Sequence, residues 1–248
     1  MTIQNQSDIV ALQHIGRIVS LVLHRMLDSV EPGMTTRELD DIGERLLSEH
    51  GARSAPHLAY DFPGSTCISV NGEAAHGVPG DRIIRPGDMV NVDVSAELGG
   101  YFADTGGTMV VPPGSPIKTR LCHATRLALA EAIKVARAGQ PINRIGRAIE
   151  HVANTHRLRI IENLGGHGVG RAIHEEPEHI AGYYDAGDQR ILKEGMVIAI
   201  EPFLSTKSRM VAEADDGWTL VGKPGNLSAQ YEHTLIVTRS EPIILTVH

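Results

Sequence analysis

The sequence predicts an α+β protein in which two similar halves share one sheet. The predicted elements follow the order helix, helix, strands, and this order occurs twice along the chain. When the segment after Gly33 is aligned with the segment after Gly139, a shift of 106 residues, four of five compared helix positions are apolar in both. No flexible linker separates the halves. We therefore expect one domain over 1–248, with halves at about 1–113 and 114–248.

The first half begins with two predicted helices. Apolar residues recur at helical spacing over 8–29, and Thr35 with Glu38 forms a capping-box pattern that opens a second helix ending near Glu49. Residues 66–71 and 89–95 are rich in strand-forming side chains. We expect residues 97–100 to form a turn that leads into a further strand over 101–111.

The second half repeats this order of elements. A long helical pattern covers 116–138, and a second helix is predicted over 141–156. Three later segments are predicted strands, namely 158–162, 195–203 and 231–238.

Composition excludes several classes of protein. The net charge is −7, from 23 basic and 30 acidic residues, which argues against nucleic-acid binding through a global positive field but leaves a local patch open. Cys67 and Cys122 are too few for a disulfide scaffold. The N-terminus lacks a signal-peptide pattern, and no apolar stretch approaches the ~18–20 residues of a membrane span. We expect a cytoplasmic protein with no membrane partner and no direct nucleic-acid partner.

Two aspartates carry the first chemical signal. If 97–100 is the turn, Asp93 lies directly opposite Asp104 on an antiparallel pair, and opposed like charges are destabilising. A bound divalent cation would remove that repulsion. Alternatively, the hairpin slips by one residue and one aspartate points to solvent. The hairpin alone leaves both interpretations open.

Three more groups occur in similar contexts. Glu201 follows an apolar strand, Glu232 begins another, and His167 lies in a glycine-rich segment that we expect to be a turn. Buried glutamates are rare unless paired. Four carboxylates and one imidazole suit Mn, Fe, Co or Zn, and two such metals ~3.5–4 Å apart can share bridging carboxylates.

Other catalytic motifs fail. The segment 174–179 resembles H-E-x-x-H, but its histidines are five residues apart and Pro177 interrupts the helix that this motif needs. The chain lacks a dinucleotide fingerprint, a phosphate loop and a nucleophile elbow. Cys67 has no adjacent base in sequence, which favours a small buried residue over a nucleophile.

Five separated motifs occur in an order that resembles the type I methionine aminopeptidases. They are SVNGEAAHGVPG, NVDVSAELGGYFADTG, GGHGVGRAIHEEP, IAIEPF, and DGWTL followed by LSAQYEHT. The resemblance spans about Ser54 to Ile244. It implies the pita-bread fold, a curved antiparallel sheet with paired helices in two pseudo-symmetric halves, as a single catalytic domain.

The resemblance also implies a set of site residues. Two divalent ions (Co, Mn, Fe or Zn) would be held by Asp93, Asp104, His167, Glu201 and Glu232. In the family pattern, Asp104 and Glu232 bridge both metals, Asp93 holds one, and His167 with Glu201 holds the other. His76 matches a histidine near the substrate's backbone amide, and His174 matches one that contacts the scissile carbonyl.

The resemblance further implies an apolar pocket for the substrate's first side chain. Its residues are Tyr60, Phe62, Cys67, Ile173 and Trp218. Three of them depart from the commonest pattern. Ile173 stands where an aromatic residue is usual, Phe62 where Tyr is frequent, and Tyr60 is one place closer to Phe62 than the family's usual Tyr. These departures bear on the selectivity for methionine.

The activity implied is removal of the initiator methionine from nascent proteins that have a small second residue. A hydroxide bridging the metals would attack the carbonyl, His174 would stabilise the oxyanion, and Glu201 would carry the proton to the leaving amine. We expect a cytoplasmic monomer whose partners are nascent N-termini. Docking to the ribosome stays open, because the loop 212–216 is acidic where relatives often carry basic residues.

Two alternatives are weighed against this function. Another exopeptidase of the same fold would cleave Xaa-Pro dipeptides, but such enzymes normally add a substantial N-terminal domain. A non-catalytic binding module should have lost ligands, and all five are present together with both histidines.

Overall fold

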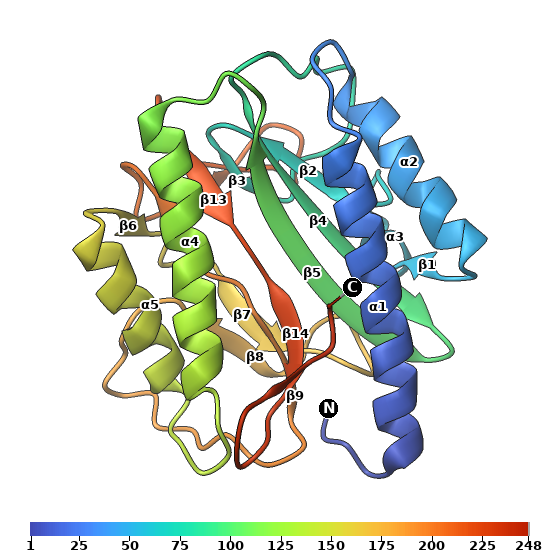
Figure 1. Ribbon diagram of the computed structural model, residues 1–248, viewed down its shortest axis with the longest axis vertical. Coiled ribbons are helices and arrows are strands. Elements are labelled where there is room, and N and C mark those ends of the chain that lie inside the picture. The colour runs from blue at the N-terminus through green and yellow to red at the C-terminus, as the bar shows by residue number, and fades with distance from the viewer. Residues whose placement is uncertain (248) are drawn as a thin grey trace.

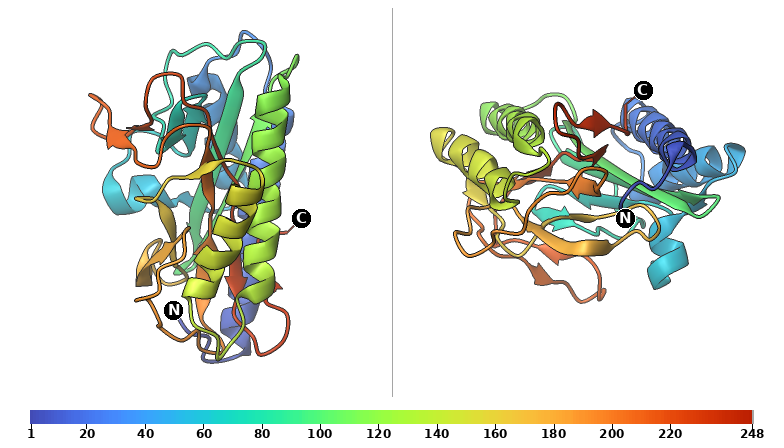
Figure 2. Two further views of the ribbon diagram at one scale, coloured as in Figure 1. Left: turned by 90° about the vertical axis from the view of Figure 1, so that its left-hand side faces the viewer. Right: turned by 90° about the horizontal axis from the view of Figure 1, so that it is seen from below.

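The computed structural model describes residues 1–247, so residue 248 of the expected domain lies outside the described part. Antiparallel strands form its central layer, and paired helices cover one side of them (Figure 1). Figure 2 shows α1, α4 and α5 on that side, with α2 beside α1 and α3 on the opposite side. The helices are α1 (Gln6–Asp28), α2 (Thr36–Glu49), α3 (Ala55–Tyr60), α4 (Pro116–Val135) and α5 (Asn143–Thr155).

The four long helices confirm the predicted helical segments. Thr35 and Glu38 form both bonds of the capping box at the start of α2, so two otherwise unpaired backbone N–H groups are satisfied. Buried apolar residues of α1 and α2 form one core with β4, and those of α4 and α5 form a second core with the later strands. Each half therefore has its own helix pair, as the repeated order of elements predicts.

In the first half, β4 (Met89–Leu98) lies between β1 (Arg53–Ser54) and β2 (Cys67–Val70), and it also pairs with β5 (Tyr101–Val110). The predicted strands at 66–71, 89–95 and 101–111 are thus confirmed. The short strand β3 (Glu73–Ala75) belongs to another sheet, in the order β11-β12-β3.

The hairpin of β4 and β5 turns at two residues instead of the predicted four. Gly99 and Gly100 both have positive φ, 61° and 82°, which is the backbone that a two-residue type I′ turn requires. Both strands therefore run further toward the turn than the sequence pattern indicated.

This tighter turn makes the predicted register wrong. Asp104 lies opposite Ser95, and Asp93 lies opposite Gly106. Because side chains alternate with a period of two, a shift of two in the pairing keeps both aspartates on one face. The two carboxylates are diagonal neighbours instead of direct partners. The alternative of a one-residue slip, which would turn one aspartate to the opposite face of the hairpin, is therefore wrong.

The second half contributes a five-stranded sheet in the order β15-β14-β9-β7-β8 and a three-stranded sheet in the order β13-β10-β6. Its strands are β6 (Arg159–Ile160), β7 (Gly165–Gly168), β8 (Glu175–Ala181), β9 (Val197–Ile200), β10 (Phe203–Ser205), β11 (Ala212–Glu213), β12 (Leu220–Val221), β13 (Ser228–Gln230), β14 (His233–Ile236) and β15 (Ile243–Ile244). The predicted strand 195–203 is two strands, because it is interrupted at Glu201 and Pro202, and proline has no N–H for a ladder.

The glycine-rich segment around His167 is a strand, so the prediction of a turn is wrong. A Cβ atom at Gly166 would overlap the carbonyl oxygen of Ala199, and one at Gly168 would overlap that of Glu176. The glycines therefore allow two neighbouring backbones to approach closely. His167 is held between them in the middle of a sheet.

Hydrogen bonds join the two halves at β5 and β14. The amide of Asp104 donates to Thr234 Oγ1 at 2.9 Å, and that hydroxyl donates to the carbonyl of Asp104 at 2.7 Å. The amide of Glu232 donates to the carbonyl of Gly106 at 2.9 Å, and Thr105 Oγ1 donates to the carbonyl of Glu232 at 2.9 Å. This joint fixes Asp104 beside Glu232.

No helix among residues 1–247 is long and apolar enough to cross a membrane.

The hairpin register generates a test. Gly99→Val should lower the free energy of unfolding by about 1–2 kcal/mol, because a β-branched residue is strained at positive φ. Gly99→Asn is the matched control, since Asn tolerates this backbone, and it should cost less than half as much. Urea unfolding measures both. Equal losses in the two variants would contradict the two-residue turn.

Candidate active site

Residues from both halves converge on a small cavity of about 90 Å³. Its lining includes four of the five predicted metal ligands, both predicted histidines and all five predicted pocket residues: Asp93, Asp104, His167, Glu201, His76, His174, Tyr60, Phe62, Cys67, Ile173 and Trp218. Pro56 and Ser95 also line it. Glu232, the fifth predicted ligand, is buried beside it. Donor atoms of Asp104, His167 and Glu232 all lie within 4.8 Å of one another.

The imidazole of His167 presents a lone pair to the carboxylates. Its Nδ1 is 3.0 Å from the carbonyl of Gly168, and a carbonyl only accepts, so Nδ1 carries the proton. The other nitrogen, Nε2, lies 3.7 Å from Asp104 Oδ2 and 3.6 Å from Glu201 Oε1. Both separations exceed a normal hydrogen bond. Burial lowers the pKa of His167 to about 3, with a smaller contribution from His174, so the ring is neutral.

The four buried carboxyl groups of the site repel one another when they are ionised. Burial, followed by the charge of Asp104, raises the pKa values of Glu201, Glu232 and Asp93 well above their usual range. Burial raises the pKa of Asp104 itself to about 6, although hydrogen bonds from Asp93 and the backbone oppose the shift. At neutral pH, four carboxyl groups in one buried place therefore resist full ionisation.

Two buried oxygens of the cluster show what this site can hold. Among the described residues 1–247, neither Asp104 Oδ1 nor Glu232 Oε1 accepts a hydrogen bond. An unsatisfied buried acceptor costs about 1–3 kcal/mol. A divalent cation would satisfy both oxygens and offset the repulsion. Four carboxylates with one neutral imidazole form a donor set that suits Mn, Fe, Co or Zn.

Gln230 belongs to the site and was not predicted. Its amide nitrogen donates to Glu232 Oε2 at 2.9 Å, and its side chain also contacts Glu201. Asn91 Nδ2 donates to Gln230 Oε1 at 2.9 Å. Gln230 therefore orients a carboxylate, much as outer partners orient metal ligands. Its position two residues before Glu232, on the same face of an extended segment, is the signal that could have revealed it.

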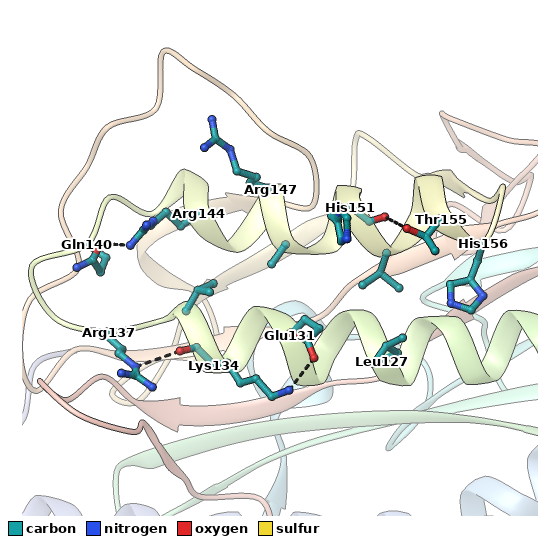
Figure 3. A pocket seen from close by; sticks show the side chains of 13 residues that line it. Leu127, Glu131, Lys134, Arg137, Gln140, Arg144, Arg147, His151, Thr155 and His156 are labelled. Atoms are coloured by element: carbon teal, nitrogen blue, oxygen red, sulfur yellow. Dashed lines mark hydrogen bonds and ion pairs between the residues drawn. The ribbon is translucent and has the colours of Figure 1, made fainter.

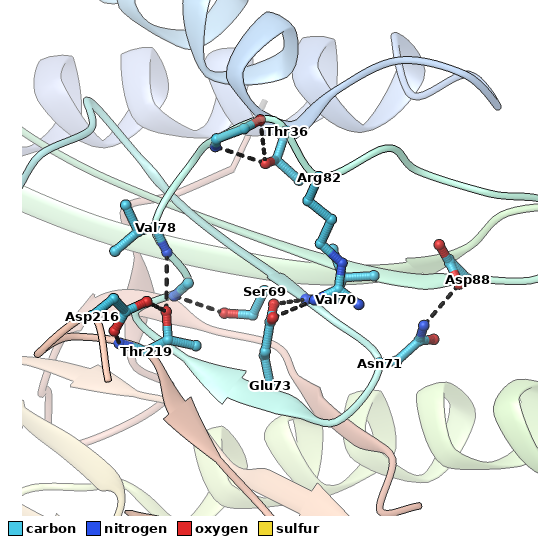
Figure 4. Close-up of polar contacts among 12 residues, drawn as sticks. Thr36, Ser69, Val70, Asn71, Glu73, Val78, Arg82, Asp88, Asp216 and Thr219 are labelled. Carbon is cyan, nitrogen blue, oxygen red and sulfur yellow. Dashed lines mark hydrogen bonds and ion pairs between the residues drawn. The ribbon is translucent and has the colours of Figure 1, made fainter. Parts of the chain in front are cut away.

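His76 lies in a loop with a strained backbone. Its φ is 53°, a region that non-glycine residues rarely adopt. The following residues are tied down, because Gly77 N donates to Ser69 Oγ at 3.1 Å and Val78 N donates to Thr219 Oγ1 at 3.3 Å. Figure 4 shows these contacts. Neighbouring polar contacts hold His76 at the cavity.

Asp216 links this loop to the wall of the pocket. Its Oδ1 accepts from the amides of Trp218 at 2.9 Å and Thr219 at 2.8 Å, and its Oδ2 accepts from Thr219 Oγ1 at 2.5 Å. Thr219 in turn accepts from Val78 (Figure 4). One carboxylate of the acidic loop therefore orients both Trp218 and the segment after His76. The sequence indicated only the charge of this loop.

The apolar side of the cavity is built from rings. Phe62 and Trp218 pack edge to face with centroids 5.2 Å apart, and Ile173 is buried beside them. Burial raises the pKa of the Cys67 thiol, with smaller contributions from Asp93 and Asp104. A neutral thiol is a weak nucleophile, which agrees with a packing role for Cys67.

Tyr60 contacts a predicted catalytic group. Its hydroxyl lies 2.7 Å from Nδ1 of His174, and the rings of His174 and His167 are 4.1 Å apart between centroids. Burial lowers the pKa of His174, and His76 adds to the shift. His174 is therefore neutral. If the Tyr60 hydroxyl donates to Nδ1, the remaining proton is on Nε2.

Comparison with known proteins assigns the family. The model of metallopeptidase family M24 matches residues 10–239. Methionine aminopeptidase 2 of Bacillus subtilis is 47% identical over 247 residues, which is 99% of each chain. The crystal structure of methionine aminopeptidase from Rickettsia prowazekii has a TM-score of 0.94 at 34% identity, covering all of both chains. Prolidase from Pyrococcus furiosus shares the fold, with a TM-score of 0.79 at 24% identity over all of this chain and 66% of that one.

The raised carboxyl pKa values predict an unusual pH dependence for metal-free protein. Between the unfolded pKa of Asp104, about 4, and its folded value of about 6, the folded state binds more protons than the unfolded state. The contribution of Asp104 to stability should therefore fall as pH rises through this window, by on the order of 2–3 kcal/mol. The buried histidines His167 and His233, whose pKa values are lowered to about 3 and about 4, contribute in the opposite direction. Urea unfolding in EDTA at pH 4.5, 5.5 and 6.5 measures the effect.

The control for this experiment is Asp104→Asn, which removes the titrating group and keeps the histidines. The stability of the parent protein relative to this variant should fall as pH rises. Excess Mn²⁺ should reverse this trend, because a ligand that binds only the folded state stabilises it. A difference between the two proteins that stays constant or grows with pH in EDTA would contradict this account of the carboxyl cluster.

Proposed function

The chain belongs to metallopeptidase family M24 and, within it, to the methionine aminopeptidases, and from this premise we propose that it hydrolyses the peptide bond after an N-terminal methionine. It is therefore a hydrolase. The observation that carries the proposal is the buried carboxylate–imidazole cluster, with two oxygens lacking hydrogen bonds, beside a small apolar cavity. Together these features support a metal-dependent exopeptidase.

The proposed cofactor is a pair of divalent ions of the Co, Mn, Fe or Zn type. Asp93, Asp104, His167, Glu201 and Glu232 would hold them. The chemistry that such ions supply when bound is a lowered pKa of water and polarisation of a carbonyl. The unsatisfied oxygens of Asp104 and Glu232 support the proposal that these two carboxylates would be among the metal ligands.

His174 is proposed to stabilise the oxyanion. The Tyr60 hydroxyl lies 2.7 Å from Nδ1 of His174, and we propose that it donates to Nδ1. The N–H on Nε2 would then donate to the carbonyl oxygen as negative charge develops there. A good donor in such a position lowers the activation barrier by about 3–4 kcal/mol. His76, held by its tethered loop, would contact the substrate's backbone amide.

Glu201 is proposed to move the proton. Its carboxylate Oε1 lies 3.6 Å from His167 Nε2, so it is at the centre of the cluster while also lining the cavity. Burial and the charge of Asp104 favour its protonated form. A carboxyl with a raised pKa is a stronger base once it is ionised. The Glu201 carboxylate would therefore take a proton from water, and the carboxylic acid so formed would deliver it to the leaving amine.

The apolar rings support methionine as the first residue. Phe62 and Trp218 line the pocket with aromatic rings, and the neutral thiol of Cys67 also lines it. Ile173 lines the pocket at the position where the family usually has an aromatic residue. A flexible, polarizable thioether fits irregular apolar spaces and aromatic edges. Preference for a small second residue is proposed from the family resemblance.

The proposed substrate is the N-terminus of a nascent protein, so the proposed place of action is the cytoplasm. All five ligands come from one chain, which supports a monomer as the active unit. We make no proposal of ribosome docking through the loop 212–216, because its residues Glu213, Asp215 and Asp216 are all exposed carboxylates.

Cleavage of Xaa-Pro dipeptides is the second candidate, since prolidases share the fold. The decisive experiment uses chelated protein with Met-Ala-Ser and with Ala-Pro, before and after addition of Co, Mn, Fe or Zn. We expect cleavage of Met-Ala-Ser to return with metal and Ala-Pro to remain intact. Asp104→Asn should reduce the rate at least 100-fold, whereas Asp81→Asn, a fully exposed carboxylate, should not.

Two results would count against the proposal. Faster turnover of Ala-Pro would favour the dipeptidase. A folded protein that binds metal but cleaves neither substrate would favour a non-catalytic binding module.

The acidic loop provides a separate prediction. Asp216→Ala should lower kcat/KM for Met-Ala-Ser about tenfold, because Trp218 and the loop of His76 lose their common anchor. Asp215→Ala is the matched control, since Asp215 is an exposed carboxylate of the same loop, and its rate should stay within twofold. Steady-state kinetics measures both variants. Equal effects would show that Asp216 has no special positioning role.

A further inference from the structure

The charges of this protein are strongly separated along the chain. Residues 116–159, which include α4 and α5, contain nine Lys and Arg side chains but only two carboxylates, Glu131 and Glu150. This segment therefore has a net charge of +7, whereas the rest of the chain carries −14. The overall charge of −7 is therefore compatible with a strongly basic segment.

A groove of about 820 Å³ lies on this segment between α4 and α5 (Figure 3). Six of its 13 lining residues carry cationic or imidazole groups: Lys134, Arg137, Arg144, Arg147, His151 and His156. Among residues 1–247, Glu131 is the one carboxylate in the lining. We call this the basic groove.

Three guanidinium groups of the groove have no carboxylate partner among the described residues. Lys134 is paired with Glu131 at 2.6 Å, but within residues 1–247 no carboxylate lies in ion-pair range of Arg137, Arg144 or Arg147. Arg137 donates to a backbone carbonyl and Arg144 to a side-chain amide. Arg147 lies over the ring of Tyr184, 4.0 Å from its centroid. These neutral contacts orient the guanidinium groups without neutralising them.

The cations of the groove gather where α4 leads into α5. Lys134 lies in the last turn of α4 and Arg137 just after that helix, whereas Arg144 and Arg147 lie in the first two turns of α5. Figure 3 shows Lys134, Arg137 and Arg144 around this end of the groove, whereas Arg147 extends from α5 on the side away from α4. Cations that come from two helices suit an anion that carries several charges.

We propose that the basic groove binds the phosphate backbone of RNA without sequence specificity. Guanidinium groups match phosphate oxygens in a two-pronged geometry, and backbone contacts of this kind provide most of non-specific affinity. An acidic protein surface is the less favoured partner, because a nucleic-acid backbone carries a phosphate at every nucleotide and so meets several neighbouring cations at once.

The groove and the cavity occupy different sides of the molecule. Helices α4 and α5 lie on the side of the strands opposite α3 (Figure 2), and Tyr60, the last residue of α3, lines the cavity. RNA in the groove would therefore leave the cavity accessible. The proposal depends on the charges of α4 and α5 and not on the proposed peptidase activity.

The test is fluorescence anisotropy of a fluorescein-labelled 20-nucleotide uridine RNA with the whole protein. We expect micromolar affinity in 50 mM KCl. With about three or four phosphates neutralised, the affinity should fall on the order of 20- to 50-fold between 50 and 200 mM KCl. Arg137→Gln, Arg144→Gln and Arg147→Gln together should weaken binding at least tenfold and reduce the slope of log affinity against log salt by about 2.

The matched control changes the same number of charges elsewhere. Arg37, Arg45 and Arg239 are exposed and paired with carboxylates, and their combined change to Gln should alter RNA affinity less than threefold. Thermal melting and cleavage of Met-Ala-Ser should be unchanged in both triple variants. If the groove variant fails to fold, Arg144→Gln alone should still reduce the salt slope by about 0.7.

Three outcomes would overturn the proposal. One is no RNA binding in 50 mM KCl. Another is an equal loss in both triple variants, which would mean that overall charge and not the groove decides binding. The third is tighter binding of polyglutamate than of RNA under the same conditions, which would assign the groove to an acidic protein.

Discussion

The burial of four carboxyl groups around one point is the constraint on which the rest of this structure depends. Asp93 and Asp104 come from the first half, and Glu201 and Glu232 come from the second. Like charges in a poorly solvated place repel one another, so the fold must hold them together from outside. Two separate cores, one beneath each helix pair, brace the halves, and threonine hydroxyls join β5 to β14 where the carboxylates meet. A cation shared between the halves would turn that repulsion into a bond across the joint.

Local sequence was sufficient for the long helices, because apolar periodicity and the capping box of Thr35 and Glu38 act within one turn or a few turns. It was insufficient where backbones meet across long separations. The glycines beside His167 are typical of a turn, yet they allow strands to pack closely, and Ala199, the neighbour of Gly166, is far along the chain. In the hairpin, the pair Gly99 and Gly100 is itself a local signal for a two-residue turn, so the four-residue prediction wrongly included Glu97 and Leu98, which belong to β4. The short strand β3 pairs with β12, which is far along the chain.

The same difference applies to the site. The ligands and pocket residues that the family resemblance implied do gather at one place, although the roles proposed for them await experiment. Supporting groups were missed, because Gln230 and Asp216 act through contacts that no motif records. Tyr60 is a residue for which the structure adds information that the sequence motif lacks. Its sequence position matched the family only loosely, whereas its hydroxyl lies within hydrogen-bond distance of His174.

The charge separation between residues 116–159 and the remaining residues also has a mechanical consequence. A molecule whose positive and negative charges have different centres has a permanent dipole, and an external field exerts a torque on it. Near any polyanionic surface, this protein would rotate until α4 and α5 face that surface, within about one Debye length, ~8 Å at physiological ionic strength. The opposite side, with the mouth of the cavity, would then point toward bulk solution. The protein would thus be oriented before it makes contact, without using binding energy. The orienting torque would weaken as the salt concentration rises.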